Sequence, residues 1–125
     1  VNKIVYKVSD VKRYDVIAYS RVKGGAYYEI KRVVGLPEET VRILNGDIYI
    51  NGERRSDVPF TMAIQISGIA EEEITLGENE YFVMGDNVNN SEDSRYTNVG
   101  NIAKTEITGK VVSILFPRSD KGKVK

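Results

Sequence analysis

The 125 residues of the chain include no cysteine, histidine or tryptophan. Without cysteine the chain can form no disulfide, no thiolate zinc site and no thiol nucleophile. Without histidine it can build neither a Ser-His-Asp triad nor a histidine-ligated metal site. Any general base must therefore be a lysine, an aspartate, a glutamate or a tyrosine.

Long apolar runs and an excess of one charge are also absent. No apolar run approaches the roughly 18 residues that a membrane span requires. Lys plus Arg and Asp plus Glu both number 18, and this balance gives no general attraction to nucleic acid. Hydrophobic residues are 41% and charged residues 29% of the chain, as in an ordinary globular protein. The length predicts a single domain, residues 1–125, with a core of its own.

Signals for β-strands recur along most of the chain. Thr40–Leu44 and Asp47–Ile50 flank Asn45-Gly46, a dipeptide that supplies the positive φ angles of a type I′ hairpin turn. A second Asn-Gly pair at residues 51–52 predicts another reversal, and residues 101–106 predict a short helical turn. Such short strands with frequent turns predict a mainly β fold, an antiparallel barrel or sandwich. Runs of β-branched and aromatic residues predict five further strands, at 15–21, 26–34, 72–76, 80–84 and 108–116, the first two joined by a turn at 23–25.

A dense polar loop, Met84–Tyr96, follows the most apolar of these strands. It holds two aspartates, a glutamate, three asparagines, two serines and an arginine. These residue types favour turns for backbone reasons alone, so a solvated surface loop is the simplest interpretation. EF-hand registers that start at Asp86 or Asn87 fail, because neither has glycine at the sixth position. Asp93 and Arg95 are two residues apart and could form an ion pair, with Asp86 as a second partner, worth about 0–1 kcal/mol if exposed.

One lysine lies inside an apolar strand pattern, Tyr28-Glu-Ile-Lys-Arg-Val-Val34. Most lysines in such positions extend their ammonium group to water. If apolar residues enclosed Lys31, burial would lower the pKa of its amine from about 10.4 toward about 7–8, the range useful to a general base. Strand alternation places Arg32 on the opposite face, whereas Glu29 shares the face of Lys31 and would oppose the decrease.

Two long motifs resemble those of type I signal peptidases. Glu29-Ile-Lys-Arg-Val-Val-Gly-Leu-Pro37 resembles the box of the catalytic lysine, and Tyr81-Phe-Val-Met-Gly-Asp-Asn87 through Asn90–Tyr96 resembles a later box. Gly109–Phe116 is similar to the closing strand of that family. Asn2-Lys3 and Arg13–Ile17 are similar to its early strands, so the resemblance covers nearly the whole chain. The short segment between the two boxes is similar to the compact Gram-positive type.

The resemblance implies a serine endopeptidase with a Ser-Lys dyad on a mostly β fold. Such an enzyme needs no metal or cofactor. It acts on the extracytoplasmic face of the cytoplasmic membrane, where it removes signal peptides from secreted preproteins. By position, Lys31 would be the general base, and Ser91 would hydrogen-bond its amine and orient it.

The resemblance also assigns a supporting role to five residues of the polar loop. Asp93 and Arg95 would form a salt bridge that braces the loop, with Asp86 and Asn87 nearby. Gly85 would let the backbone turn tightly below the site.

The family's nucleophile has no match in the chain. It lies in a Ser-Met-x-Pro segment one strand before the region that matches Val1–Lys3, and the family's membrane anchor lies further upstream. None of the eight serines stands in such a context, and the chain starts at Val1 without a methionine. We interpret the chain as the C-terminal catalytic part of a signal peptidase, and we expect these residues alone to be inactive.

Alternatives from other classes remain open. A non-catalytic relative could serve as a binding or assembly factor for surface proteins, although the presence of Lys31 and Ser91 argues against it. The self-cleaving repressors also use a Ser-Lys pair, but the lysine box fits signal peptidases better. A purely structural β domain is the remaining interpretation. In the peptidase, Thr61–Ile66 would be an apolar segment that helps to receive an extended substrate.

Overall fold

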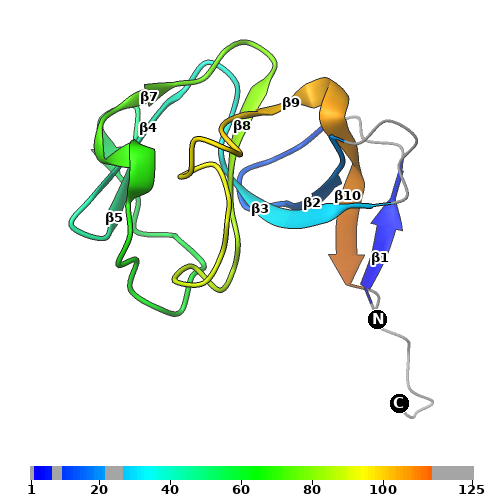
Figure 1. Cartoon of the computed structure of the whole chain (residues 1–125), viewed down its shortest axis with the longest axis horizontal. Helices are drawn as coiled ribbons and strands as arrows, with labels where there is room; N and C mark the ends of the chain where they lie inside the picture. The colour runs from blue at the N-terminus through cyan, green and yellow to red at the C-terminus, as the bar shows by residue number, and fades with distance from the viewer. Residues whose placement is uncertain (1, 7–9, 22–26, 114–125) are drawn as a thin grey trace.

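The strands form two antiparallel sheets that lie side by side (Figure 1). The computed structural model describes residues 2–6, 10–21 and 27–113. Within them the larger sheet has the strand order β1-β10-β2-β3-β8-β9, and the smaller sheet has the order β6-β5-β4-β7. This arrangement confirms the mainly β, antiparallel fold that the sequence predicts.

The described residues contain ten strands and two short 3-10 helices. The larger sheet consists of β1 (Asn2–Val5), β2 (Val16–Tyr19), β3 (Glu29–Gly35), β8 (Glu80–Met84), β9 (Ile102–Ala103) and β10 (Ile107–Ser113). The smaller sheet consists of β4 (Thr40–Leu44), β5 (Asp47–Ile50), β6 (Glu53–Arg54) and β7 (Ile74–Thr75). The helices are η1 (Gly68–Glu71) and η2 (Lys104–Glu106). Neither helix is long and apolar enough to cross a membrane, and the described ranges contain no other.

The two Asn-Gly pairs form the hairpin turns that the sequence predicts. Asn45 and Gly46 have φ angles of 52° and 83°, both positive as a type I′ turn requires. Asn51 and Gly52 repeat the pattern, with φ angles of 52° and 82°, and return the chain from β5 to β6. The smaller sheet therefore follows from local turn chemistry.

Other predicted elements differ from the structure at their ends. The strand predicted at 72–76 is reduced to the two residues of β7, because η1 precedes it and only Ile74 and Thr75 pair with β4. The helical turn predicted at 101–106 is divided: β9 pairs with β8 and buries Ile102, and only η2 is helical. The hairpin of β2 and β3 forms as predicted, whereas the predicted turn at 23–25 and the end of the strand predicted at 108–116 lie outside the described residues.

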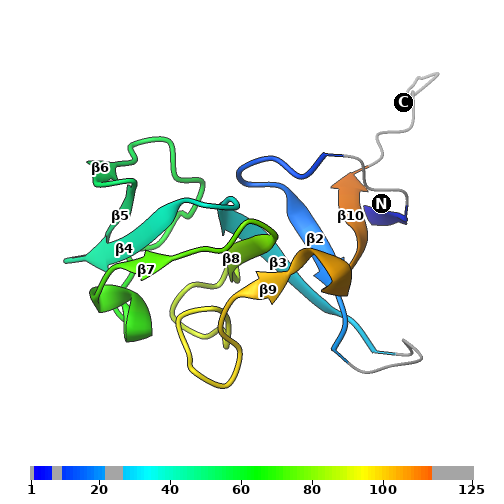
Figure 2. The same cartoon turned by 90° about the horizontal axis from the view of Figure 1, so that it is seen from above.

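The strands β3 and β8 separate two hydrophobic cores, and Figure 2 shows both strands between the two lobes. Successive strand residues point to opposite faces. Val33 and Val83 therefore enter one core, while Val34 and Met84 enter the other. The first core also contains Ile17, Tyr19, Tyr81 and Ile102, and the second contains Val41, Ile43, Ile48, Ile50, Phe82 and Val88 among others.

Candidate active site

Lys31 lies within β3, opposite Ile17 of the neighbouring strand β2. Alternation places it on the face of Glu29 and Val33, whereas Arg32 points to the other side and binds Asp86 there. Lys31 is half-buried, so it is not fully enclosed by apolar residues. Its amine instead reaches the polar loop that follows β8.

A chain of hydrogen bonds runs from Lys31 into the loop. Lys31 Nζ donates to Ser91 Oγ over 3.1 Å, and Ser91 Oγ donates to Asp93 Oδ2 over 2.9 Å. An ionised carboxylate can only accept, so the Ser91 proton is held by Asp93 and the Ser91 oxygen accepts from the amine. Ser91 therefore accepts a hydrogen bond from an N–H of Lys31. When the amine is neutral, its lone pair is not engaged by Ser91.

Asp93 and Arg95 form a fully buried ion pair beneath this chain. Arg95 Nε lies 2.8 Å from Asp93 Oδ1 and Arg95 Nη2 lies 2.8 Å from Asp93 Oδ2, and both side chains are 0% exposed. The guanidinium also donates to the carbonyls of Val88 and Ile66. An exposed ion pair contributes little to the stability of the fold, but this pair is buried. Buried charges are tolerated only when they are paired and completely hydrogen-bonded, so removal of one partner is costly. The interpretation of a purely solvated surface loop is wrong for this half of the loop.

The Asp93 carboxylate also joins the start of the loop to its end. Its Oδ2 accepts the backbone N–H of Gly85 at 3.0 Å in addition to the Ser91 hydroxyl. Ser94, which sequence reasoning missed, is fully buried and accepts the N–H of Val83 at 2.9 Å. Composition gave no signal for Ser94, because serine is equally typical of an exposed turn.

Gly85 is needed for space and not for the tight turn that we expected of it. Its φ angle is not positive. A Cβ at this position would lie 2.2 Å from Ser91 Oγ and 2.7 Å from Ser91 Cβ, and 3.5 Å from Lys31 Nζ. Ser91 can therefore approach Lys31 only over a residue that has no side chain.

Asp86 does not take part in the buried pair. It is exposed and binds Arg32 through two hydrogen bonds, of 2.7 Å and 2.8 Å, so the expectation of Asp86 as a second partner of Arg95 is wrong. The hydrogen bonds from Arg32 lower the pKa of Asp86. Asn87 is also exposed, and its backbone carbonyl accepts the N–H of Asn90 in a turn, while its side chain makes no hydrogen bond to any described residue.

Asn89 ties the apolar segment Thr61–Ile66 to the polar loop. Its Oδ1 accepts the N–H of Gln65, and its Nδ2 donates to the carbonyl of Ala63, both at 2.9 Å. The segment is not a strand, and its Ile64 is buried in the second core. The sequence gave no indication of this role, because the partners of Asn89 lie 24 and 26 residues away.

Acidic side chains in the described ranges form no group of three or more that could hold a metal ion. The site brings together an amine, a hydroxyl and a buried carboxylate, which hydrogen bonds hold in a fixed order.

Comparison with known proteins identifies the family. The profile of the family "Signal peptidase, peptidase S26" matches residues 1–116. Signal peptidase I of Bacillus amyloliquefaciens is 34% identical over an alignment that covers 100% of this chain and 69% of that protein. Signal peptidase I S of Bacillus subtilis strain 168 is 31% identical, with coverage of 94% and 66%.

A solved structure agrees with these matches. The crystal structure of a signal peptidase I from Enterococcus faecalis V583 superposes with a TM-score of 0.62 and 28% identity, covering 83% of this chain and 98% of that one. The chain belongs to the signal peptidase family, peptidase S26. It spans about two thirds of the length of the curated relatives named above.

Proposed function

We propose that this chain carries the general base, and the residues that support it, of a type I signal peptidase. The reaction is endoproteolytic removal of signal peptides from exported preproteins at the extracytoplasmic face of the cytoplasmic membrane. The observation that carries the proposal is the order of hydrogen bonds from Lys31 through Ser91 to Asp93.

This order suits an amine that must accept a proton. Neutral Lys31 donates an N–H to Ser91, and the Ser91 hydroxyl donates its own proton to Asp93. The lone pair of the Lys31 amine is therefore directed away from Ser91. The lone pair takes the proton of a nucleophilic serine as that serine attacks the peptide carbonyl. The ammonium returns the proton to the leaving amine, and water then hydrolyses the acyl-enzyme. Ser91 orients the base and does not react.

The nucleophile in this proposal is a serine of a Ser-Met-x-Pro segment, which none of the 125 residues matches. Among the described residues, Ser91 is the serine that hydrogen-bonds Lys31, and its proton is directed at Asp93. The chain by itself is therefore expected to be inactive.

The edge of β3 offers a place for an extended substrate. Glu29, Ile30 and Lys31 pair with β2 on one side, while pairing with β8 begins only at Arg32. In the described part of the chain, the other edge of these three residues is unpaired, so a peptide could add there as a strand. A cavity of about 540 Å³, lined by Ile30 and six other residues, lies on the opposite face from Lys31 and could receive substrate side chains.

The test is a version of the chain that begins with a Ser-Met-x-Pro strand, assayed on a signal-peptide substrate. Lys31→Ala and Lys31→Arg should both abolish cleavage while the fold persists, since a guanidinium does not deprotonate near neutral pH. Lys104→Ala, which removes an exposed lysine on η2, is the matched control and should cleave normally. Normal turnover by either Lys31 variant would show that Lys31 is not the base.

A further inference from the structure

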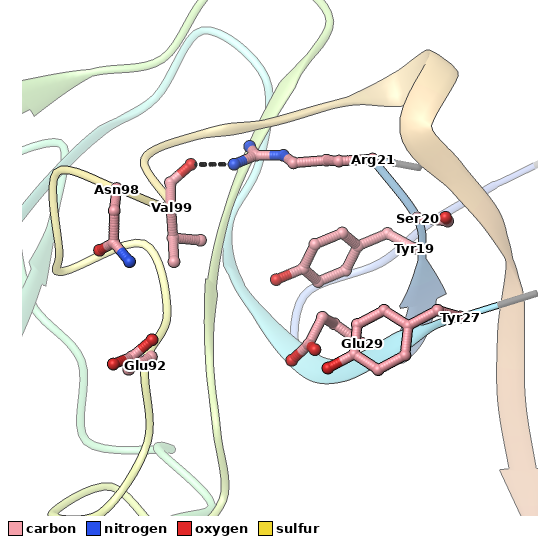
Figure 3. A pocket seen from close by; sticks show the side chains of 8 residues that line it. All are labelled: Tyr19, Ser20, Arg21, Tyr27, Glu29, Glu92, Asn98 and Val99. Carbon is pink, nitrogen blue, oxygen red and sulfur yellow. Dashed lines mark hydrogen bonds between the residues drawn. The ribbon is translucent and has the colours of Figure 1, made fainter. Parts of the chain in front are cut away.

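A pocket of about 220 Å³ lies beside the proposed base (Figure 3). Glu29 lines it from β3, two residues before Lys31 and on the same face of the strand. Glu92 lines it from the polar loop and is the neighbour of Ser91 in sequence. The pocket is therefore lined by close sequence neighbours of both members of the Lys31–Ser91 pair. The remaining lining residues are Tyr19, Ser20, Arg21, Tyr27, Asn98 and Val99.

The Tyr19 hydroxyl is a buried polar group that points into this pocket. Tyr19 is 3% exposed, and its hydroxyl forms no hydrogen bond with any described residue. Figure 3 shows the hydroxyl directed into the space between Glu29 on one side and Glu92 with Asn98 on the other. A hydroxyl withdrawn from water is costly to leave without a partner. Burial raises the pKa of Tyr19 to about 12, so the group keeps its proton and can donate or accept.

The uncompensated charge of the pocket is negative. The cationic residue in its wall, Arg21, already donates to the Val99 carbonyl (Figure 3). It is also engaged by the Glu106 carboxylate and by the Asn101 carbonyl. Glu29 and Glu92 approach from separate elements. The Tyr27 hydroxyl already interacts with Glu29, but a carboxylate offers about four lone-pair sites, so Glu29 can accept further hydrogen bonds. The rings of Tyr19 and Tyr27 add aromatic faces, which attract cations.

We propose that this pocket is a subsite for a basic side chain, lysine or arginine, of the polypeptide substrate. An ammonium or guanidinium group would donate to Glu29, to Glu92 and to the oxygen of Tyr19. The volume is below the roughly 300–1,000 Å³ of pockets that hold a whole drug-sized ligand, so it suits one side chain. This inference rests on the proposed function.

The pocket's place along β3 predicts where the basic residue lies in the substrate. Residues two apart in an extended strand are separated by roughly 6.5–7 Å, which is the offset of Glu29 from Lys31. A substrate strand that pairs with β3 has the same repeat. The basic residue of the substrate therefore lies about two positions from the substrate bond that is cleaved beside Lys31.

Binding without catalysis is the first arm of the test. The 125-residue chain is titrated with acetyl-Ala-Lys-Ala-amide and with the norleucine analogue, which has nearly the same shape without the charge, while the backbone amide resonances of the pocket residues are followed by NMR. The lysine peptide should bind about tenfold more tightly, and Glu92→Gln or Tyr19→Phe should remove most of that difference. Glu53→Gln, the same change at an exposed position on β6, should leave it intact. Equal affinity for the two peptides would overturn the proposal.

Cleavage is the second arm and separates the two proposals. The version that carries a Ser-Met-x-Pro strand is assayed on substrates with lysine or norleucine two residues from the cleaved bond. We expect kcat/KM to favour lysine by about tenfold, and Glu92→Gln to reduce that ratio of lysine to norleucine cleavage. Equal cleavage of both substrates would refute the subsite and leave the peptidase intact. No cleavage of either substrate would refute the peptidase, and with it the substrate role of the pocket, even where lysine-specific binding persists.

Discussion

At the scale of single residues, the absence of a side chain at Gly85 decides whether Ser91 can reach Lys31. We expect Gly85→Ala to displace Ser91, because the new Cβ would lie 2.2 Å from its Oγ. Forcing an extra carbon into this contact should cost about 1–3 kcal/mol of stability. Urea denaturation measures that loss, and the version supplied with a nucleophile measures the loss of cleavage.

Gly77→Ala is the matched control for Gly85→Ala. Its φ angle is also not positive, and its added Cβ would meet only the flexible carboxylate of Glu80, at 3.1 Å. This variant should be close to the parent in both measurements. If the Gly85 and Gly77 variants behaved alike, steric exclusion at Ser91 would not be the reason for glycine at position 85.

The buried pair of Asp93 and Arg95 has an exposed counterpart of the same spacing. Arg55 and Asp57 are also two residues apart, and their charged atoms are 2.7 Å apart, but both side chains are at least one-third exposed. Arg95→Ala should cost about 3–5 kcal/mol because it leaves a buried carboxylate unpaired. Arg55→Ala should cost about 0–1 kcal/mol. Chemical denaturation of both variants checks the contrast, and equal losses would contradict a role for burial.

At the scale of elements, local signals predicted the fold better than they predicted the site. Both ends of the β4 and β5 strands were predicted correctly, because the turn between them depends only on the adjacent residues Asn45 and Gly46. β9 was mistaken for part of a helical turn because its pairing partner in β8 lies more than 20 residues earlier. The burial of Arg95 was missed for the same reason. The composition of the loop around Arg95 matches an exposed loop, and one acceptor of the Arg95 guanidinium, the Ile66 carbonyl, is 29 residues away.

An ion pair between Arg13 and Glu39 joins segments that lead into the two sheets. Arg13, ahead of β2, donates to both carboxylate oxygens of Glu39, ahead of β4, at 2.8 Å and 2.6 Å. Burial alone would raise the pKa of Glu39, but the hydrogen bonds from Arg13 and from the Leu36 N–H outweigh it, and the pKa is lowered. A carboxylate whose pKa is lowered on folding stabilises the protein above its unfolded pKa. That stabilisation disappears as the pH falls through the folded pKa.

The pair therefore predicts a loss of stability in acid that depends on Glu39. The melting temperature should fall as the pH is lowered from about 5 through the ordinary glutamate pKa of about 4.3 and below it. Glu39→Gln should be less stable than the parent at pH 7 and should show a smaller decrease over that range. Thermal melts at several pH values provide the measurement, with Glu53→Gln on exposed β6 as the control. An identical pH slope in the parent and Glu39→Gln would exclude this carboxylate as a source.

At the scale of the whole molecule, the two cores share β3 and β8 and should therefore unfold together. Ile43 is fully buried in the core of the smaller sheet. Ile43→Ala should cost about 2–5 kcal/mol. We expect amide hydrogen exchange to accelerate by similar factors in β4 and in the distant strands β2 and β10, because neither core can open without disturbing the shared strands. Unchanged exchange in β2 and β10 would instead define two independent folding units.

The hydrogen bond between Lys31 and Ser91 joins residues that are 60 positions apart in the sequence. A ribosome that adds about 5–20 residues per second makes Lys31 several seconds before Ser91 exists. During that interval the lysine is an ordinary flexible cation, since nothing yet directs its amine. The orienting serine and the aspartate that holds its proton are made within two residues of each other, after β8 is complete. In a growing chain the proposed base is therefore not oriented, and its amine acquires a direction only once the polar loop has folded and Ser91 accepts its hydrogen bond.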